Sequence, residues 1–238
     1  MKKITTTMLI AAVVLLSSSC KKDLVGEGPI TTETRSVPAF TSIDLQMNGN
    51  VYYTKSTETK IELTAKETIH DMLETTVSNN RLLIRYRNGK NYDNDPSIRI
   101  NVYAPEVSGF LLNTSGNIHS ESDLDVHTLL LRSNGSGYIL LKGIAAQTID
   151  AQSMQSGRIS AQSGTTINET LKTGGSANID LSAVSAQNVW ARTTGSGDIR
   201  VKVSDNLEAV IDGSGDIFFR GYPHLSSHIS GTGKIQRF

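Results

Sequence analysis

Residues 193–217 read TTGSGDIRVKVSDNLEAVIDGSGDI, and the pentapeptide GSGDI occurs twice within them, at 195–199 and at 213–217. Related turns recur along the last two-thirds of the chain, each with a small anchor residue preceded by Ser or Thr. The seven anchors are Gly116, Gly137, Gly157, Ala177, Gly197, Gly215 and Gly233. These turns recur at intervals of roughly 20 residues, a period that indicates a solenoid of stacked coils.

Equivalent positions in the repeats share their chemistry. The residue two places after the anchor is isoleucine in every copy: Ile118, Ile139, Ile159, Ile179, Ile199, Ile217 and Ile235. Other mostly apolar columns lie four places after, six before and eight before the anchor, and this alternation predicts strands with one buried face. We therefore expect an all-β fold, a single-stranded right-handed parallel β-helix with coils of about 18–21 residues.

Glu169 interrupts the apolar column that lies eight places before the anchor. A buried carboxylate is costly unless it is paired or protonated. We therefore expect a local register shift in which Ile167 fills the column and Glu169 points outward at a bulge. The alternative is a buried acid poised for chemistry.

The N-terminus has the features of an export signal. Lys2 and Lys3 precede an apolar run at 8–16 that is too short to span a bilayer, so residues 1–19 are interpreted as a signal peptide. Cys20 is the only cysteine and follows three serines, which resembles a bacterial lipobox, although Ser17 occupies the usual leucine position. We expect Cys20 to be acylated and to anchor the protein to the outer membrane, facing the cell surface or the periplasm; a secreted protein cleaved among the serines is the alternative.

The mature chain divides into a tether and one domain. Residues 20–34 comprise the acylated cysteine and a polar segment, which is interpreted as a flexible linker, and 35–238 form the β-helix. Residues 43–53 already fit the coil pattern around a turn at 48–50. The region up to residue 103 is less regular, with a short helix expected within 67–75, and we expect this N-terminal part to cap the open end of the solenoid.

Three sequence features resemble a known family. They are the repeated S-G-[DNRK]-I turns, the segment SVPAFTSIDL at 36–45 and the segment LEAVIDGSGDI at 207–217. They are similar to the auto-transporter adhesin head domain of the GIN type, which is common in Bacteroidetes lipoproteins. The resemblance covers residues 35–237 and implies a right-handed β-helix located outside the inner membrane. It transfers no catalytic or binding residue to this chain.

Composition gives no indication of nucleic-acid binding. The chain has 23 basic and 23 acidic residues and a formal net charge of zero, so no basic patch is indicated. His224 and His228 are four positions apart, which on one strand means about 13 Å and is too far for a shared zinc ion. We therefore predict no metal site and no cofactor.

Asp198, Asp216 and Trp190 are the candidate surface residues. The two aspartates occupy the same offset in adjacent coils, so we expect them about 4.8 Å apart, close enough to hold calcium or to perturb a pKa. The rest of their column is mixed, which favours a role in the turn. Trp190 falls outside the apolar columns, and an exposed tryptophan can stack on a sugar.

The resulting hypothesis is a non-enzymatic envelope lipoprotein that presents a β-helical surface to a glycan or protein partner. The first alternative is a carbohydrate-active β-helix of the lyase or hydrolase kind, in which Arg200 or Arg220 would join the carboxylates. The second is a scaffold that self-associates through its terminal coils. The sequence leaves the oligomeric state open.

The lipobox interpretation predicts that Cys20→Ala abolishes lipid labelling. The thioether-linked lipid can form only on the cysteine, so the variant should also lose sensitivity to globomycin, which blocks lipoprotein processing. Metabolic labelling with a radioactive fatty acid, followed by immunoprecipitation, measures the effect. Unchanged labelling of Cys20→Ala would refute the anchor.

Overall fold

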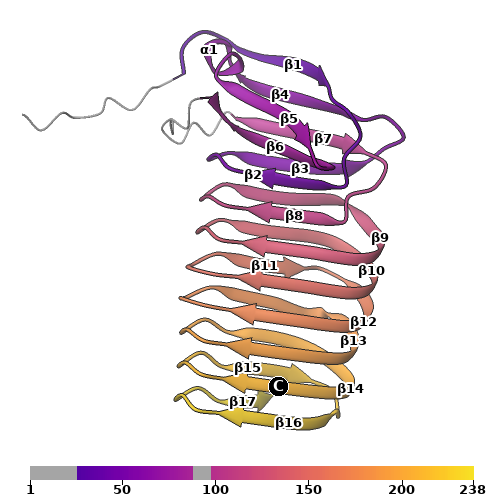
Figure 1. The fold of residues 1–238 in the computed structure, drawn as a ribbon, viewed down its shortest axis with the longest axis vertical. Coiled ribbons are helices and arrows are strands. Elements are labelled where there is room, and N and C mark those ends of the chain that lie inside the picture. Colours follow the sequence, from indigo (N-terminus) through magenta and orange to yellow (C-terminus); the bar gives the residue numbers. More distant parts are fainter. Residues whose placement is uncertain (1–25, 88–97) are drawn as a thin grey trace, which may run out of the picture.

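The computed structural model describes residues 26–87 and 98–238. It is a β-solenoid of about six turns, with 67% of its residues in strands and one short helix. All 17 strands belong to one continuous sheet that winds around the rod (Figure 1). The signal segment and Cys20 lie outside the described residues.

Among its described residues, the irregular N-terminal part contains one helix and seven strands. These are β1 (Ile30–Ser36), β2 (Ser42–Leu45), β3 (Asn50–Lys55), β4 (Lys60–Lys66), α1 (Glu67–His70), β5 (Leu73–Ser78), β6 (Arg81–Tyr86) and β7 (Arg99–Ala104). The regular coils contain the other ten strands. These are β8 (Gly109–Leu112), β9 (Asn117–Ser133), β10 (Tyr138–Ser153), β11 (Arg158–Ala161), β12 (Gly164–Thr173), β13 (Asn178–Thr193), β14 (Ile199–Ile211), β15 (Ile217–Arg220), β16 (His224–Ile229) and β17 (Ile235–Arg237).

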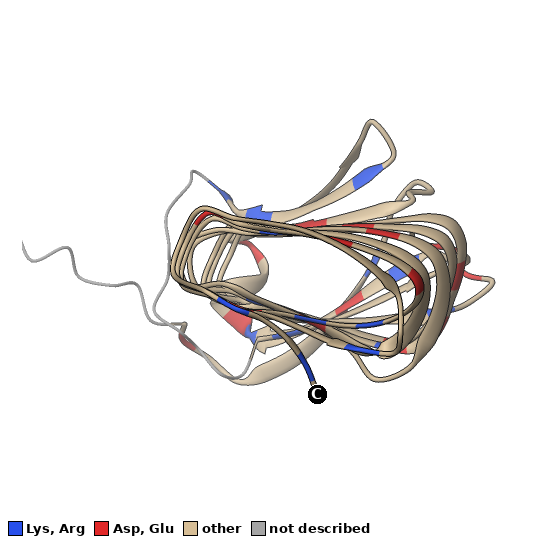
Figure 2. Ribbon diagram, turned by 90° about the horizontal axis from the view of Figure 1, so that it is seen from below, with Lys and Arg blue, Asp and Glu red and all other residues tan. Residues whose placement is uncertain are grey.

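Each coil crosses the rod twice, which produces two broad faces. Strands that directly follow a turn form the post-turn face: β3, β7, β11, β15, β17 and the first parts of β9, β10, β13 and β14. The opposite, pre-turn face is formed by β2, β8, β16, the end of β12 and the last parts of β9, β10, β13 and β14. Viewed along the axis, the two faces enclose a flattened core (Figure 2).

The predicted isoleucine column is confirmed. Parallel pairing places each isoleucine beside its equivalent in the next coil, from Ile118 and Ile139 through to Ile217 and Ile235. Val51 continues the column in the first coil, where it pairs with Ile118. The first six isoleucines are fully buried, whereas Ile235 in the last coil is only partly buried because no coil covers it.

Glycine is required at Gly197 and Gly215 because neighbouring turns stack closely there. A Cβ atom on Gly197 would lie 1.8 Å from the carbonyl oxygen of Ala177, and one on Gly215 would lie 2.0 Å from that of Gly197. Both separations are well below contact distance, so a side chain there would force adjacent coils apart. The anchor column therefore reflects the coil spacing.

The expected bulge at Glu169 is wrong. Glu169 lies in register with Ile149 and Val189, is 2% exposed and has no hydrogen-bond partner for either carboxylate oxygen, whereas Ile167 is 41% exposed. Continuous backbone pairing over 168–173, on both sides of the strand, keeps it in register and places the glutamate in the core. Burial raises the pKa of the Glu169 carboxyl well above its ordinary value. The group is therefore expected to be protonated and neutral in the folded protein.

The N-terminal end is closed by antiparallel strands. β4 pairs antiparallel with both β1 and β7, and β5 pairs antiparallel with β6. Because β1 begins at Ile30, residues 30–34 belong to the folded domain and the expected tether boundary at 34 is too late. The short helix expected within 67–75 is present and ends at His70; Leu73 starts β5, where Thr75, Thr76 and Val77 favour an extended backbone.

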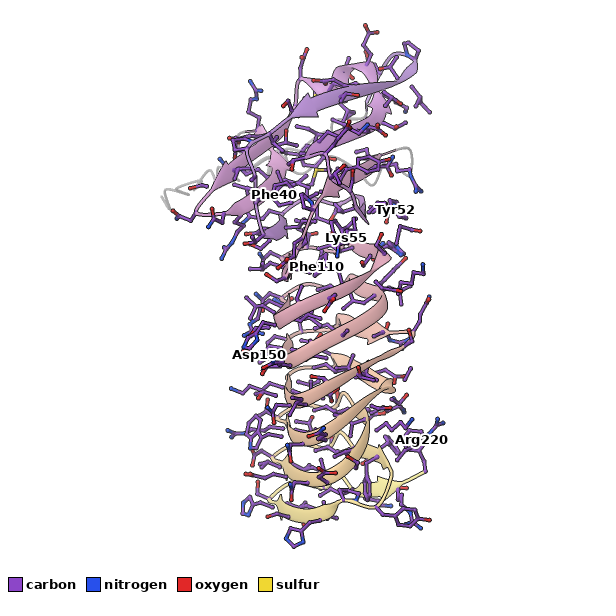
Figure 3. All side chains as sticks on the ribbon, turned by 90° about the vertical axis from the view of Figure 1, so that its right-hand side faces the viewer. Phe40, Tyr52, Lys55, Phe110, Asp150 and Arg220 are labelled. Atoms are coloured by element: carbon purple, nitrogen blue, oxygen red, sulfur yellow. The ribbon has the colours of Figure 1, made fainter. Side chains whose placement is uncertain are left out.

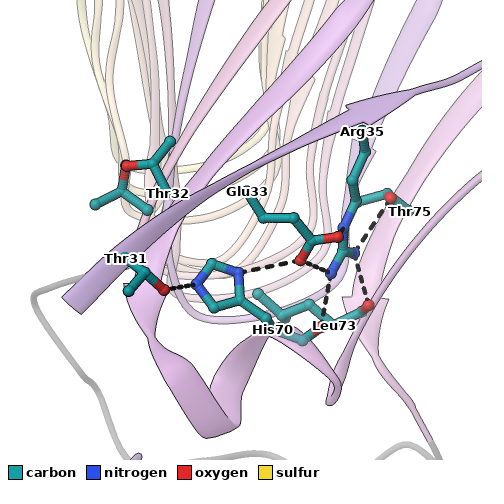
Figure 4. A network of polar contacts seen from close by, with 8 residues as sticks. Thr31, Thr32, Glu33, Arg35, His70, Leu73 and Thr75 are labelled. Atoms are coloured by element: carbon teal, nitrogen blue, oxygen red, sulfur yellow. Dashed lines mark hydrogen bonds and ion pairs between the residues drawn. The ribbon is translucent and has the colours of Figure 1, made fainter. Parts of the chain in front are cut away.

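Arg35 fastens β1 onto this cap (Figure 4). Its guanidinium donates to the carbonyl oxygens of His70 at 2.6 Å and Leu73 at 2.8 Å and to both carboxylate oxygens of Glu33. His70 lies beside the same carboxylate, with Nδ1 3.2 Å from Oε2, and its Nε2 is 3.0 Å from the Thr31 hydroxyl. The Arg35 hydrogen bond, aided by the Arg35 and His70 charges, lowers the pKa of Glu33 against a smaller opposing effect of burial. This network ties β1 to α1 and β5 within the cap.

The isoleucine column predicts that Ile179→Asp unfolds the central coils. It would bury an unpaired carboxylate between Ile159 and Ile199 and would lose about 2 kcal/mol of apolar burial in addition. Asn178→Asp, one residue earlier, should be nearly silent because its carboxylate can still accept the Asp198 N–H bond. Thermal melts followed by circular dichroism test the pair, and equal effects would contradict the register.

The buried Glu169 predicts that stability falls as pH rises. Between the ordinary carboxyl pKa of 4.5 and the raised native value, the folded state keeps a proton that the unfolded chain has released. Glu169→Leu should remove this loss and stabilise the domain at pH 7 by about 1–3 kcal/mol. Urea unfolding across pH 4 to 9 measures the free energy of unfolding of each protein, with a substitution at an exposed position, Glu106→Gln, as control. A wild-type profile identical to that of Glu169→Leu would contradict the burial.

Candidate binding face

The post-turn face carries two outward columns of side chains. The first column contains Asn50, Asn117, Tyr138, Arg158, Asn178, Asp198, Asp216 and Lys234; the second contains Tyr52, His119, Leu140, Ser160, Asp180, Arg200, Phe218 and Gln236. Side chains point outward here because their strand neighbours, including the isoleucine column, point into the core. Figure 3 shows Tyr52 and Arg220 on this side of the rod and Asp150 on the opposite side.

Asp198 and Asp216 lie in adjacent coils, and both bind backbone. Oδ1 of Asp198 accepts the N–H of Asp216 at 3.0 Å, and Oδ1 of Asp216 accepts the N–H of Lys234 at 2.7 Å. The other carboxylate oxygen of Asp198 forms an ion pair with Arg200 at 3.1 Å. Within residues 26–87 and 98–238, no group of three or more His, Cys, Asp or Glu side chains could hold a metal ion. Both aspartates thus connect successive coils.

Trp190 lies on the pre-turn face, away from both aspartates. It is partly buried between Thr170 and Glu208, donates from Nε1 to the Glu208 carboxylate at 3.1 Å, and has the Lys172 ammonium 5.3 Å from its ring centroid. Tyr138 belongs to the other face, so it cannot share a ligand with this indole. The structure therefore does not bring the three candidate surface residues together.

An aromatic cluster occupies the post-turn face near the N-terminal coils. Tyr52 and His119 are stacked, with ring centroids 4.8 Å apart and planes 11° apart. Tyr138 meets His119 edge to face at 5.1 Å, and the Arg99 guanidinium lies 3.6 Å from the Tyr52 ring centroid. Three successive coils thus contribute rings to one contiguous surface.

Beside this cluster lies a hollow of about 530 Å³, which we call the Tyr138 hollow. Its lining residues are His119, Ser136, Gly137, Tyr138, Leu140, Ser156, Arg158 and Ser160. The serines come from the turns of two coils and from the second outward column, so the coil spacing sets their separation. Rings form one wall, and hydroxyl groups and a guanidinium form the rest.

Several polar groups of the Tyr138 hollow have no partner among residues 26–87 and 98–238. Among the described residues, Arg158 has no ion pair and the hydroxyl groups of Ser136, Ser156 and Ser160 have no hydrogen bond. Several other polar side chains of this face are engaged: Asp198 is paired with Arg200, and Asp180 accepts from Ser182. Tyr138 is 39% exposed. The hollow therefore combines exposed aromatic surface with free hydrogen-bonding capacity.

His119 contributes to the hollow as a neutral ring. Desolvation lowers the pKa of the His119 imidazole. The charge of Arg99 lowers this pKa further, whereas the nearby charge of Glu121 raises it. A neutral imidazole can accept as well as donate a hydrogen bond. The positive charge beside the rings therefore comes from Arg99 and Arg158.

A second hollow, of about 560 Å³, lies on the short side of the rod. The repeat becomes shorter at this level, and the pairing between β13 and β14 shifts there, between Leu181 and Ser185 and again after Ala186. Lys202 and Tyr222 stand at its border, and Tyr222 is 86% exposed. Its shape follows directly from the change in repeat length.

Sequence reasoning missed the Tyr138 hollow. In the sequence, Tyr138 and Arg158 are only irregular members of the aspartate column, and such a mixture is typical of an ordinary turn. The available signal was the run of rings at equivalent offsets in successive coils, Tyr52 and His119 in one column and Tyr138 in the next. Their contacts depend on side-chain directions that only the folded coil defines.

The family model described as "Putative auto-transporter adhesin, head GIN domain" matches residues 39–223. The chain belongs to this family. Residues carrying the aromatic cluster, both hollows and the paired aspartates all lie within the matched range. The resemblance inferred from the turns is thereby confirmed.

Solved structures support the GIN-domain assignment. A "putative adhesin" from Bacteroides fragilis is 27% identical, with 89% of this chain and 98% of that chain covered and a TM-score of 0.84. A "putative lipid binding protein" and a "putative adhesin", both from Parabacteroides distasonis, are 22% and 20% identical; each match covers 90% of this chain and 98% of the other, with TM-scores of 0.75 and 0.71. These two show the shared fold. No curated protein sequence is significantly similar to the chain.

Proposed function

We propose that this GIN-domain protein is a non-catalytic envelope protein that binds a glycan in the Tyr138 hollow. The observation that carries the proposal is the combination of an aromatic wall with hydroxyl and guanidinium groups that have no partner within the described domain. Sugar rings present apolar C–H faces to aromatic rings and hydroxyl groups to hydrogen-bonding side chains. The hollow offers both kinds of contact side by side.

The size of the hollow favours a saccharide over a protein surface. About 530 Å³ lies within the range of small-molecule sites, about 300–1,000 Å³. A stable protein interface instead needs about 800 Å² from each partner, centred on a dry apolar core. In the described part of the chain, the post-turn face has no such core, since several of its polar side chains form hydrogen bonds or ion pairs with one another. A glycan end or branch that enters the hollow needs no such core.

The positions of the carboxylates in the domain favour a binding role over glycoside hydrolysis. A glycosidase pair needs two carboxyl groups flanking one bond, with one pKa raised. Asp198 and Asp216 are instead occupied by backbone N–H groups. Glu169 has the raised pKa, but it lies in the core and is 2% exposed, so a substrate cannot reach it.

The proposed location is the outer membrane, through lipid on Cys20. The described chain begins at the cap end of the rod, where α1 and β1 lie (Figure 1). None of the helices in the described residues is long and apolar enough to cross a membrane. An anchor at Cys20 would attach the cap end to the bilayer and direct the later coils away from it, with the Tyr138 hollow accessible on the side of the rod.

The glycan proposal predicts that Tyr138→Ala and Arg158→Ala each weaken binding on the order of tenfold, since an aromatic contact or a charged hydrogen bond contributes about 1–2 kcal/mol. The soluble domain would first be screened on a glycan array, and the best glycan then titrated by calorimetry. Both residues are exposed at the rim of the hollow, so the variants should keep the wild-type melting temperature.

Trp190→Ala and Arg192→Ala are the matched controls, one aromatic and one arginine on the pre-turn face. They should leave glycan affinity unchanged. If the Trp190 variant loses binding while the Tyr138 variant does not, the ligand site is on the opposite face. If no glycan on the array binds, the glycan proposal is wrong.

A further inference from the structure

The two ends of the rod differ in how their strands are covered. The N-terminal end is closed by the antiparallel strands β1 and β4. At the other end, β16 pairs only with β14, and β17 only with β15, within the described residues. Leu225 and Ile229 are 43% and 46% exposed, whereas Leu207 and Ile211, their equivalents one coil earlier, are 1% and 0% exposed. The last coil thus presents an unpaired edge and an open apolar layer.

The terminal residues do not cover this layer. The N–H of Phe238 bonds to the Phe219 carbonyl oxygen at 3.1 Å, and its ring packs edge to face against Phe218. The Arg220 guanidinium lies 4.6 Å from the same ring centroid. These contacts hold Phe238 along the post-turn face, beside the edge. Sheet edges of this kind are normally shielded, because they pair readily with other strands.

The last coil is also cationic. Residues 217–238 contain Arg220, Lys234 and Arg237 and no Asp or Glu, although the whole chain has no net charge. Lys and Arg residues near the C-terminus are visible in the axial view of Figure 2. A second copy of the same end would bring like charges together.

Side-chain oxygens in successive coils accept backbone N–H bonds in a series that we call the aspartate ladder. Oδ1 of Asn178 accepts from Asp198, Asp198 from Asp216, and Asp216 from Lys234. At Lys234 the ladder ends with an ammonium group. A strand arriving beside Lys234 would be matched by a carboxylate at the same offset, about 4.8 Å away.

We propose that the β16–β17 edge is a docking site for an extended acidic segment of another protein, which adds to the sheet as the next coil. Main-chain hydrogen bonds to the free edge would supply affinity, as in other cases of strand addition. Apolar side chains at alternate positions would cover Leu225 and Ile229, and acidic residues would face Lys234 and Arg237. This proposal is independent of glycan binding, which concerns the side of the rod.

A peptide with the sequence of residues 206–219, NLEAVIDGSGDIFF, is a suitable probe. The same segment already pairs with the inner edges of β16 and β17 within the domain, and it carries three carboxylates and alternating apolar residues. We expect saturable one-to-one binding of the fluorescently labelled peptide to the intact domain by anisotropy. Hydrogen exchange should slow at 224–229 and 235–237.

The charge requirement is tested with a control peptide in which the three acidic residues are lysine, and with the double variant Lys234→Glu and Arg237→Glu. Both changes should weaken binding on the order of tenfold or more. The two side chains are exposed, so the variant should fold with an unchanged melting temperature. Leu225→Lys, also at an exposed position, should weaken binding by removing the apolar contact.

Three results would overturn the proposal. They are no binding of the acidic peptide, equal binding of the lysine peptide, and protection located away from the last coil. Light scattering of the domain alone gives a further check. A dimer that Leu225→Lys converts to a monomer would identify a second copy as the occupant and would also reject the acidic partner.

Discussion

The structure depends on the parallel, in-register pairing of each coil with the next along its two broad faces. Because pairing is in register, each side chain lies directly beside its equivalent in neighbouring coils. Columns of identical chemistry follow, such as the isoleucines from Ile118 to Ile217. Turns must stack at the same spacing, and glycines such as Gly197 permit the close approach. One geometric constraint thus accounts for the core, the turns and the length of the repeat.

Register also explains why an unfavourable residue can persist. Glu169 cannot turn outward without moving the paired backbone of β12, which is bonded on both sides over several residues. Protonation is the less costly response, and it leaves a neutral acid among apolar side chains. The strength of the backbone ladder therefore sets the charge state of this side chain. The column count places Glu169 inward correctly, and the expected bulge came from the cost of burying a carboxylate.

The faces and the ends of the solenoid have different physical roles. Along the post-turn face, the side chains of Asn117, Asn178, Asp198 and Asp216 bond to a neighbouring coil and so contribute to stacking. The Tyr138 hollow departs from this pattern because its serines and Arg158 are not used in that way. The last coil departs from it in another way, since its backbone edge and apolar layer have no cover among the described residues. Departures from the repeat therefore mark the two surfaces proposed for binding.

The sequence by itself determined the period, the inward columns, the turns and the family, because these properties repeat and each copy reinforces the others. The isoleucine column and the coil around residues 43–53 could be read directly from spacing. The sequence did not reveal that Glu169 is buried, that residues 30–36 form a strand, or that the Tyr138 hollow exists. These are single occurrences, decided by backbone pairing and by side-chain directions between residues distant in sequence. A repeat pattern describes what all coils share, whereas ligand-binding capacity arises where one coil differs from its neighbours.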